Sequence, residues 1–128
     1  MAVAKAKDFI LEAPVGIVEP IVEEYLDGPK WNLKNTDFNG LARMYTARRR
    51  SFLQRDHELT VILRSGAPQS PGQTQVSVAH ERTTKSQKVD LMGSNRKAIE
   101  EFQEEIVAKV REAVSRGEAS AAQWRPSV

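Results

Sequence analysis

The chain has 128 residues and no cysteine, with 40% apolar residues, 28% charged residues and a formal net charge of +2. This length suits one domain with one core, and the lack of cysteine excludes disulfides, thiol nucleophiles and thiolate metal sites. No segment has the ~20 consecutive apolar residues of a membrane span, and charged residues interrupt the N-terminal stretch, so we expect a cytoplasmic protein with no membrane span.

The N-terminal part predicts a strand followed by a helix. The apolar run in DFILEAP has the length of a strand and stops at Pro14, which lacks a backbone donor. Valines and Tyr25 then recur at spacings of three and four residues, which is typical of one face of a helix. The helix either begins near Glu19 with Pro20 at its first position, or is longer and bends at Pro20. The sequence DGP at 27–29 ends it.

Strand candidates follow, and together they predict an antiparallel meander. They are KWNLKN at 30–35, LARMYTARRR at 41–50, HELTVILRS at 57–65 and TQVSVAHERTT at 74–84. Between the first two, TDFNGL is a predicted turn, because Asn39-Gly40 can supply the positive φ angles of a tight hairpin. The Gly-, Pro- and Ser-rich residues 66–73 form a predicted loop.

The last predicted element is a long amphipathic helix. Ser94 can cap its start, and Gly117 can end it in the left-handed conformation. Its apolar residues recur at spacings of three and four from Ile99 to Val114. Such a stripe has to be buried, and the predicted sheet is the available surface.

Both ends of the chain resemble helix-grip (START-like) domains. The opening DFILEAPVGIVEPIVEEYLDGPKW has an apolar strand, an Ala-Pro pair and a helix with spaced valines. The closing QKVDLMGSNRKAIEEFQEEI is similar to the final helix of several small bacterial domain families of unknown function, in which a strand, a glycine and an Asn-Arg pair precede the helix. The resemblance implies this fold, and it implies no shared catalytic residues.

These patterns predict an α+β fold: an antiparallel sheet of about four to five strands, with an N-terminal helix and a long C-terminal helix packed on one face. We expect residues 1–116 to form a single domain and residues 117–128 to form a C-terminal tail. The predicted core consists of Phe9, Leu11, Val18, Val22, Trp31, Leu33, Leu59, Val61, Leu63, Val76, Val78, Ile99, Phe102, Ile106 and Val110.

Basic residues are concentrated in one part of the chain. Residues 1–29 hold two lysines against six carboxylates, whereas residues 30–64 hold eight basic residues against three acidic ones. The arginines of this basic segment are the candidate site for an anion or a partner: Arg43, Arg48, Arg49, Arg50 and Arg55.

Two interpretations of these arginines stay open. On a strand, Arg43, Tyr45 and Ala47 share one face, and a sheet face with Arg and Tyr can bind RNA or single-stranded DNA through phosphate contacts and base stacking. Alternatively, the arginines are solvated on the outer face of the sheet and protect an edge from aggregation.

The two histidines, His57 and His80, lie on neighbouring predicted strands. A metal ion needs three or four convergent ligands, and no such spacing is present, so we expect no metal site and interpret both as exposed histidines at strand ends. The sequence has no phosphate-binding glycine loop and no nucleophile elbow. We therefore expect no catalysis and no cofactor.

Three functions follow from these observations. We favour a non-catalytic binding or interaction module for a small apolar ligand or a protein partner. The second is a nucleic-acid-binding protein that uses the basic segment. The third is a self-assembling structural protein of phage or envelope type, in which the acidic N-terminal part of one copy meets the basic segment of the next.

Overall fold

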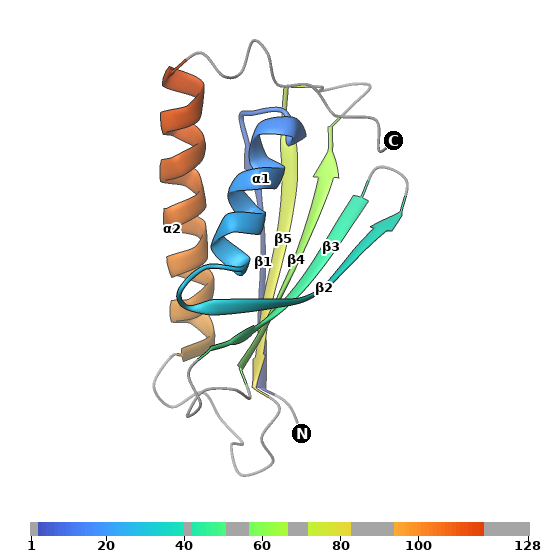
Figure 1. Ribbon diagram of the computed structural model, residues 1–128, viewed down its shortest axis with the longest axis vertical. Helices are drawn as coiled ribbons and strands as arrows, with labels where there is room; N and C mark the ends of the chain where they lie inside the picture. The colour runs from blue at the N-terminus through green and yellow to red at the C-terminus, as the bar shows by residue number, and fades with distance from the viewer. Residues whose placement is uncertain (1–2, 40–41, 51–56, 67–71, 83–93, 117–128) are drawn as a thin grey trace.

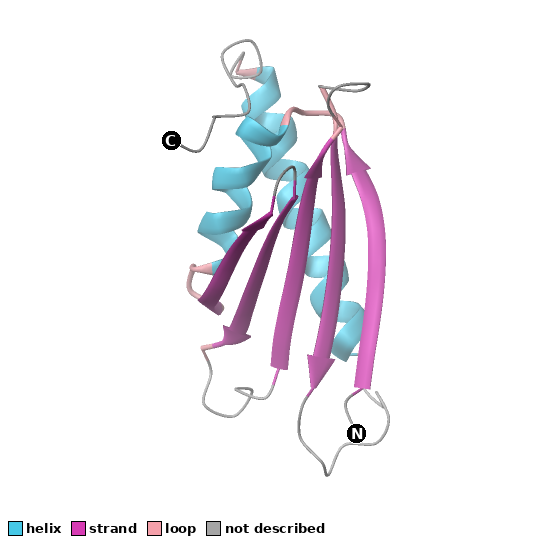
Figure 2. Cartoon of the chain, turned by 90° about the vertical axis from the view of Figure 1, so that its right-hand side faces the viewer, coloured by secondary structure: helices cyan, strands magenta, loops and turns pink. Residues whose placement is uncertain are grey.

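The computed structural model describes residues 3–39, 42–50, 57–66, 72–82 and 94–116. In chain order, its elements are β1 (Val3–Leu11), α1 (Val15–Leu26), β2 (Trp31–Asn39), β3 (Ala42–Arg49), β4 (His57–Ser65), β5 (Thr74–Arg82) and α2 (Ser94–Ser115). The strands form one antiparallel sheet in the order β1-β5-β4-β3-β2. Both helices lie on the same side of this sheet (Figures 1 and 2). The predicted α+β class and the meander from β2 to β5 are confirmed.

Helix α1 follows directly after Pro14, whose extended backbone precedes the first helical residue. Pro20 lies inside the helix, so the longer of the two predicted helices is the one that forms. The helix buries one face of regularly spaced apolar residues against the sheet, as the spacing predicted. It ends at Leu26, and the backbone N–H of Asp27 then donates to the carbonyl of Glu23.

The hairpin of β2 and β3 is longer than predicted. The turn was expected to begin at Thr36, but Thr36 and Phe38 continue strand β2 and pair with Tyr45 and Arg43 of β3. This part of the prediction was wrong, because cross-strand pairing extends the ladder to the pair Asn39–Ala42. The connecting residues 40–41 lie outside the described residues. The pairing register of β2 with β3 changes between Leu33 and Asn35, which indicates a bulge in β2.

The core lies between the sheet and the two helices. Phe102, at the centre of the α2 stripe, is fully buried, and its ring meets that of Tyr25 edge to face with the centroids 5.4 Å apart. All the predicted core residues are buried except Phe9 and Leu33, which are partly buried against the core. The structure adds Tyr45 and Ala47 of β3, both fully buried.

The two histidines are also buried, so the prediction of exposed histidines at strand ends was wrong. His57 is 6% exposed and His80 is 0% exposed. They lie on the core-facing side of β4 and β5, because each follows the period-two alternation of buried neighbours such as Leu59 and Val78. Their rings form a hydrogen bond between Nδ1 of His57 and Nε2 of His80 over 3.1 Å.

Among the described residues, no helix is long and apolar enough to cross a membrane. The predicted C-terminal tail, 117–128, and with it the predicted stop at Gly117, lies outside the described residues. Helix α2 begins at Ser94, the residue that was predicted to cap its start.

Candidate functional site

The structure separates the arginines of the basic segment instead of gathering them on one surface. Successive side chains of β3 point to opposite faces of the sheet, so Arg43 and Arg49 lie on the helix side and Arg48 lies on the outer side. Arg50 follows the end of the strand, and Arg55 lies outside the described residues.

Two of these arginines pair with carboxylates of different elements. Nε of Arg43 lies 2.6 Å from Oε2 of Glu19 in α1, and both side chains are mostly buried. Nε of Arg48 lies 3.4 Å from Oε2 of Glu58 on the neighbouring strand β4, in a more exposed position. The first pair joins sheet and helix, whereas the second lies across two strands.

The other two arginines contact the start of β2 and the turn that precedes it. The guanidinium of Arg49 stacks over the ring of Trp31, 4.3 Å from the ring centroid. Arg50 donates to the carbonyl oxygen of Gly28 over 2.7 Å and to the carboxylate of Asp27 over 3.1 Å. In the described part of the chain, Arg43, Arg48, Arg49 and Arg50 therefore all make structural contacts.

Tyr45 does not serve as an exposed stacking platform. Its side chain is fully buried, and its hydroxyl donates to Oε2 of Glu23 in α1 over 3.0 Å. Burial, followed by the charge of Glu23, raises the pKa of Tyr45. The face that Tyr45 shares with Arg43 and Ala47, as predicted, is thus the core face, and it offers no tyrosine to a nucleic-acid base.

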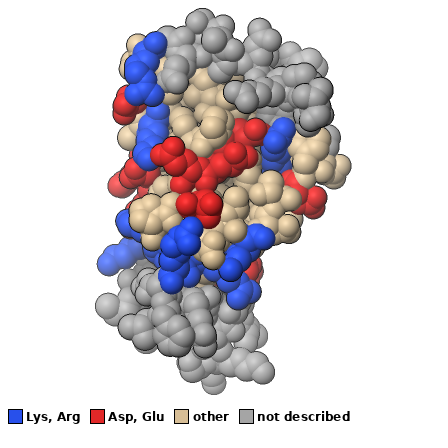
Figure 3. Space-filling view, viewed as in Figure 1, with Lys and Arg blue, Asp and Glu red and all other residues tan. Residues whose placement is uncertain are grey.

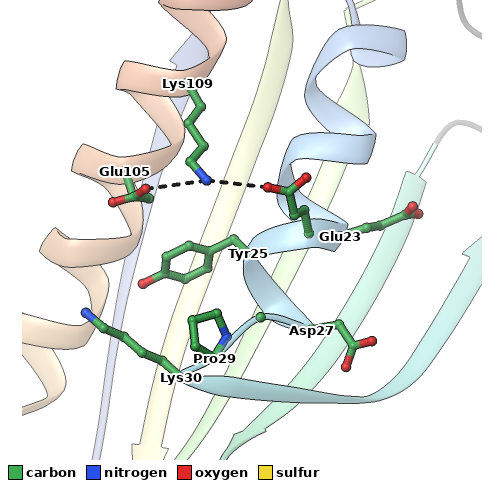
Figure 4. A pocket seen from close by; sticks show the side chains of 9 residues that line it. Glu23, Tyr25, Asp27, Pro29, Lys30, Glu105 and Lys109 are labelled. Atoms are coloured by element: carbon green, nitrogen blue, oxygen red, sulfur yellow. Dashed lines mark ion pairs between the residues drawn. The ribbon is translucent and has the colours of Figure 1, made fainter.

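A hollow of about 500 Å³ lies between the end of α1, the α1–β2 turn and the middle of α2. Figure 4 shows the ring of Tyr25 projecting from α1 across the hollow towards α2, with Pro29 beside it. The lining residues are Glu23, Glu24, Tyr25, Asp27, Gly28, Pro29, Lys30, Glu105 and Lys109. The hollow thus combines an apolar part with charged groups at its rim.

Two polar groups below the hollow lack hydrogen-bond partners among the described residues. They are the hydroxyl of Tyr25 and the indole N–H of Trp31, and both atoms are buried. Burial, followed by the charge of Glu101, raises the pKa of Tyr25 to about 12, while the neighbouring Trp31 N–H acts in the opposite direction. The two groups are therefore close neighbours whose contact falls short of regular hydrogen-bond geometry.

Ion pairs connect the two helices across the hollow. Nζ of Lys109 in α2 lies 3.6 Å from Glu24 of α1 and 3.5 Å from Glu105 of its own helix, as the dashed lines in Figure 4 show. Nζ of Lys30, the last residue of the α1–β2 turn, lies 2.8 Å from Oε1 of Glu101 of α2. Figure 3 shows that acidic side chains gather in the middle of this face of the molecule, with basic side chains around them.

The sequence did not reveal this site. Its residues come from two segments, 23–30 and 105–109, that are far apart in the chain, and neither segment has a motif of its own. The lysines and glutamates of α2 have the pattern of an ordinary solvated helix face.

Solved structures resemble this chain in fold, although no family model and no curated protein matches it. The crystal structure of Ara h 8.0201 matches with a TM-score of 0.52 and 10% identity over 91% of this chain and 99% of that one. The Zhui aromatase/cyclase from Streptomyces sp. R1128 has a TM-score of 0.44 and 11% identity, covering 97% and 100% of the two chains. An uncharacterized protein from Rhizobium leguminosarum has a TM-score of 0.42 and 10% identity, covering 88% and 99%.

These similarities concern the fold alone, because the identities are so low. The fold is of the helix-grip type, as the resemblance of the two ends of the chain predicted.

Proposed function

We propose that this protein is a non-catalytic small-molecule-binding module whose ligand occupies the hollow between α1, the α1–β2 turn and α2. The observation that carries the proposal is the pair of buried, unpartnered groups of Tyr25 and Trp31 beside a hollow of about 500 Å³. A ligand that reaches the Tyr25 hydroxyl supplies the hydrogen-bond partner that the described protein residues do not.

The dimensions of the hollow support the proposal. Pockets for small ligands typically measure about 300–1,000 Å³ and combine an apolar lining with a few polar groups that orient the ligand. Tyr25 and Pro29 offer apolar surface, and the buried Tyr25 hydroxyl orients the ligand once binding displaces the side chains that cover it. By contrast, Phe102, Leu59 and Val61 are fully buried in the core between sheet and helices.

The hydroxyl of Tyr25 provides a specific test of the proposal. The variant Tyr25→Phe removes a buried polar group that lacks a partner, so the stability of the protein should stay the same or rise. Affinity for ligands that use the hydroxyl should fall. If the Tyr25 hydroxyl had a purely structural role, Tyr25→Phe would have the opposite effect: the protein would be less stable and its affinity for ligands would be unchanged.

Binding is best measured by titrating the ¹⁵N-labelled protein with a library of small aromatic and aliphatic compounds. We expect shift changes centred on the amides of 23–30 and 105–109, and weaker binding by Tyr25→Phe. Phe38→Leu is the control, because Phe38 is an exposed aromatic residue of β2 that does not line the hollow. Binding that perturbs residues elsewhere, or that is identical in wild type and Tyr25→Phe, contradicts the proposal.

The other two functions stay predictions without a structural observation that favours them. For nucleic acid, the contacts of Arg43 and Arg49 with Glu19 and Trp31 would have to be exchanged for phosphate contacts. For self-assembly, sedimentation at low and high salt would detect association between the acidic and basic segments.

A further inference from the structure

We propose that the exposed strand β2 is a docking edge for a second copy of this chain. The two β2 strands pair antiparallel about a two-fold axis at Thr36, so that one sheet runs through both copies. This docking is independent of ligand binding in the hollow, because β2 does not line the hollow.

Strand β2 is an edge of the sheet in the described part of the chain. It pairs with β3 on one side, and its other side faces away from the sheet. The start of this edge is covered, because the backbone N–H of Leu33 donates to Oδ1 of Asp27 over 3.3 Å. Every residue from Lys34 to Asn39 is exposed, and this part of β2 lies far from α2 in Figure 1. Another strand can add to an edge of this kind.

The bulge in β2 decides which of its residues share a face. The pairing of β2 with β3 skips Lys34, which is the additional residue of the bulge. Leu33, Thr36 and Phe38 then lie opposite the residues of β3 that face the helices, so they lie on the helix side of the sheet. With the axis at Thr36, Leu33 of one copy is opposite Phe38 of the other. Paired residues of antiparallel strands must share a face, and this register meets that condition.

Leu33 and Phe38 form an apolar pair in this register. Phe38 is a large aromatic side chain that is 44% exposed, and Leu33 is only partly buried against the core. The guanidinium of Arg43 stacks on the Phe38 ring, 4.6 Å from its centroid, which restricts the orientation of the ring. Cross-strand contacts of aromatic with aliphatic side chains stabilise paired strands, and the two-fold axis supplies this contact twice.

The charges of β2 are complementary in the same register. Lys34 and Asn35, the two residues at the bulge, together lie opposite Asp37 of the second copy. The side chains of Lys34 and Asp37 are exposed, and no ion pair in the described part of the chain uses either of them. Opposite charges across paired strands attract, and symmetry gives two such pairs.

A bulge and a lysine commonly protect an edge strand from pairing with unrelated strands. In β2 they exclude a regular strand but fit a second β2, whose own bulge lies at the symmetric position. A two-fold pair closes on itself and does not propagate. The dimer therefore differs from a self-assembling structural protein in which acidic and basic segments meet.

Sedimentation equilibrium of the full chain over a wide range of concentrations tests the proposal. Strand β2 has 9 residues, so the paired edge is at most about 30 Å long and belongs to the small, weak class of interfaces. We expect a monomer–dimer equilibrium with a dissociation constant in the micromolar range or above. A protein that is still monomeric at about 1 mM overturns the proposal.

A charge exchange tests the register. Asp37→Lys puts two lysines opposite each other at both symmetric positions and should raise the dissociation constant of the dimer roughly five- to thirtyfold. The double variant with Lys34→Asp and Asp37→Lys should restore it to within about twofold of the wild-type value, because the pair is reversed but intact. Asp8→Lys is the matched control, since Asp8 is an exposed residue of β1 at the opposite edge of the sheet.

The concentration dependence of the wild-type amide shifts is a second measurement that needs no variant. Amides of 33–38 should shift as the concentration of the ¹⁵N-labelled protein rises, whereas those of 75–79 on β5 should not. A dimer that is equally strong in wild type and Asp37→Lys overturns the assignment to β2, and so does a double variant that stays as weak as Asp37→Lys. Oligomers that keep growing with concentration contradict a closed pair.

Discussion

The rings of His57 and His80 lie side by side in the core, with Nδ1 of His57 3.1 Å from Nε2 of His80. Between two neutral rings, one nitrogen donates and the other accepts. The contact pairs two polar groups inside the core, where a ring nitrogen that loses its partner is costly. We therefore expect His57→Leu to lower the free energy of unfolding by about 1–3 kcal/mol, because His80 loses this partner.

Urea denaturation of the wild-type protein and of His57→Leu measures this loss. Equal stability of the two proteins would show that the contact between the two rings does not stabilise the core.

The two tyrosines of the chain should ionise unusually late. Burial raises the pKa of Tyr25 to about 12, and burial with the charge of Glu23 raises that of Tyr45 as well. Since the usual tyrosine value is 10.0, the stabilisation from Tyr25 is complete below pH 10 and is lost as the pH rises towards 12. Tyrosinate absorbance should therefore be nearly absent at pH 10 in the folded protein. Titration of Tyr25→Phe and Tyr45→Phe assigns each group, and an ordinary midpoint near 10 in either variant would refute the burial of the remaining tyrosine.

The ion pair of Arg43 and Glu19 should contribute more to stability than that of Arg48 and Glu58. The first pair is shorter and its side chains are 16% and 18% exposed, while the side chains of the second are 49% and 25% exposed. A double-mutant cycle with Arg43→Met and Glu19→Gln should give a coupling energy of about 1–3 kcal/mol. The equivalent cycle for Arg48 and Glu58 should give less than about 1 kcal/mol. Equal coupling energies for the two pairs would contradict this expectation. They would mean that releasing Arg43 to bind an external anion costs no more than releasing Arg48.

Truncating Phe102 should test how α2 is held on the sheet. Phe102 is fully buried in the core, so Phe102→Ala should lower the free energy of unfolding by ~3–5 kcal/mol. Phe38→Ala is the matched control, because the same truncation at a side chain that is 44% exposed costs less. If thermal or chemical denaturation shows similar losses for both variants, the packing of α2 described above is wrong.

Much of the fold was predictable because the spacing of apolar residues along each segment indicates both its secondary structure and its buried face. The stripe from Ile99 to Val110 on α2 and the alternation of Leu59, Val61 and Leu63 on β4 identify the buried faces directly. Both periods follow from backbone geometry and need no knowledge of the partner element.

The buried histidines show where residue type misled the prediction. His57 is two residues from Leu59, and His80 is two residues from Val78, so each histidine lies on the same face of its strand as a core residue. The alternation of the strands therefore already indicated that both histidines face the core. Their polarity argued for exposure, but each ring satisfies the other's nitrogen across the two strands. Tyr45 was missed for a similar reason, since the helix that supplies Glu23 to its hydroxyl is distant in sequence.

The hollow could not be predicted from the sequence. It exists because α1 ends at Leu26 and the turn then leads into β2, which leaves space between this turn and α2. The distance between Glu24 and Lys109 is a property of helix packing, and no local pattern of either helix contains it.

The location of bound ligand tests the central claim most directly. In a complex of the ¹³C,¹⁵N-labelled protein with a small aromatic compound that shifts the amides of 23–30 and 105–109, intermolecular NOEs report which side chains touch the probe. We predict NOEs from the probe ring to the ring protons of Tyr25 and to Pro29. NOEs to the sheet interior instead, at Val61 and Val78, would contradict a site between the end of α1 and α2.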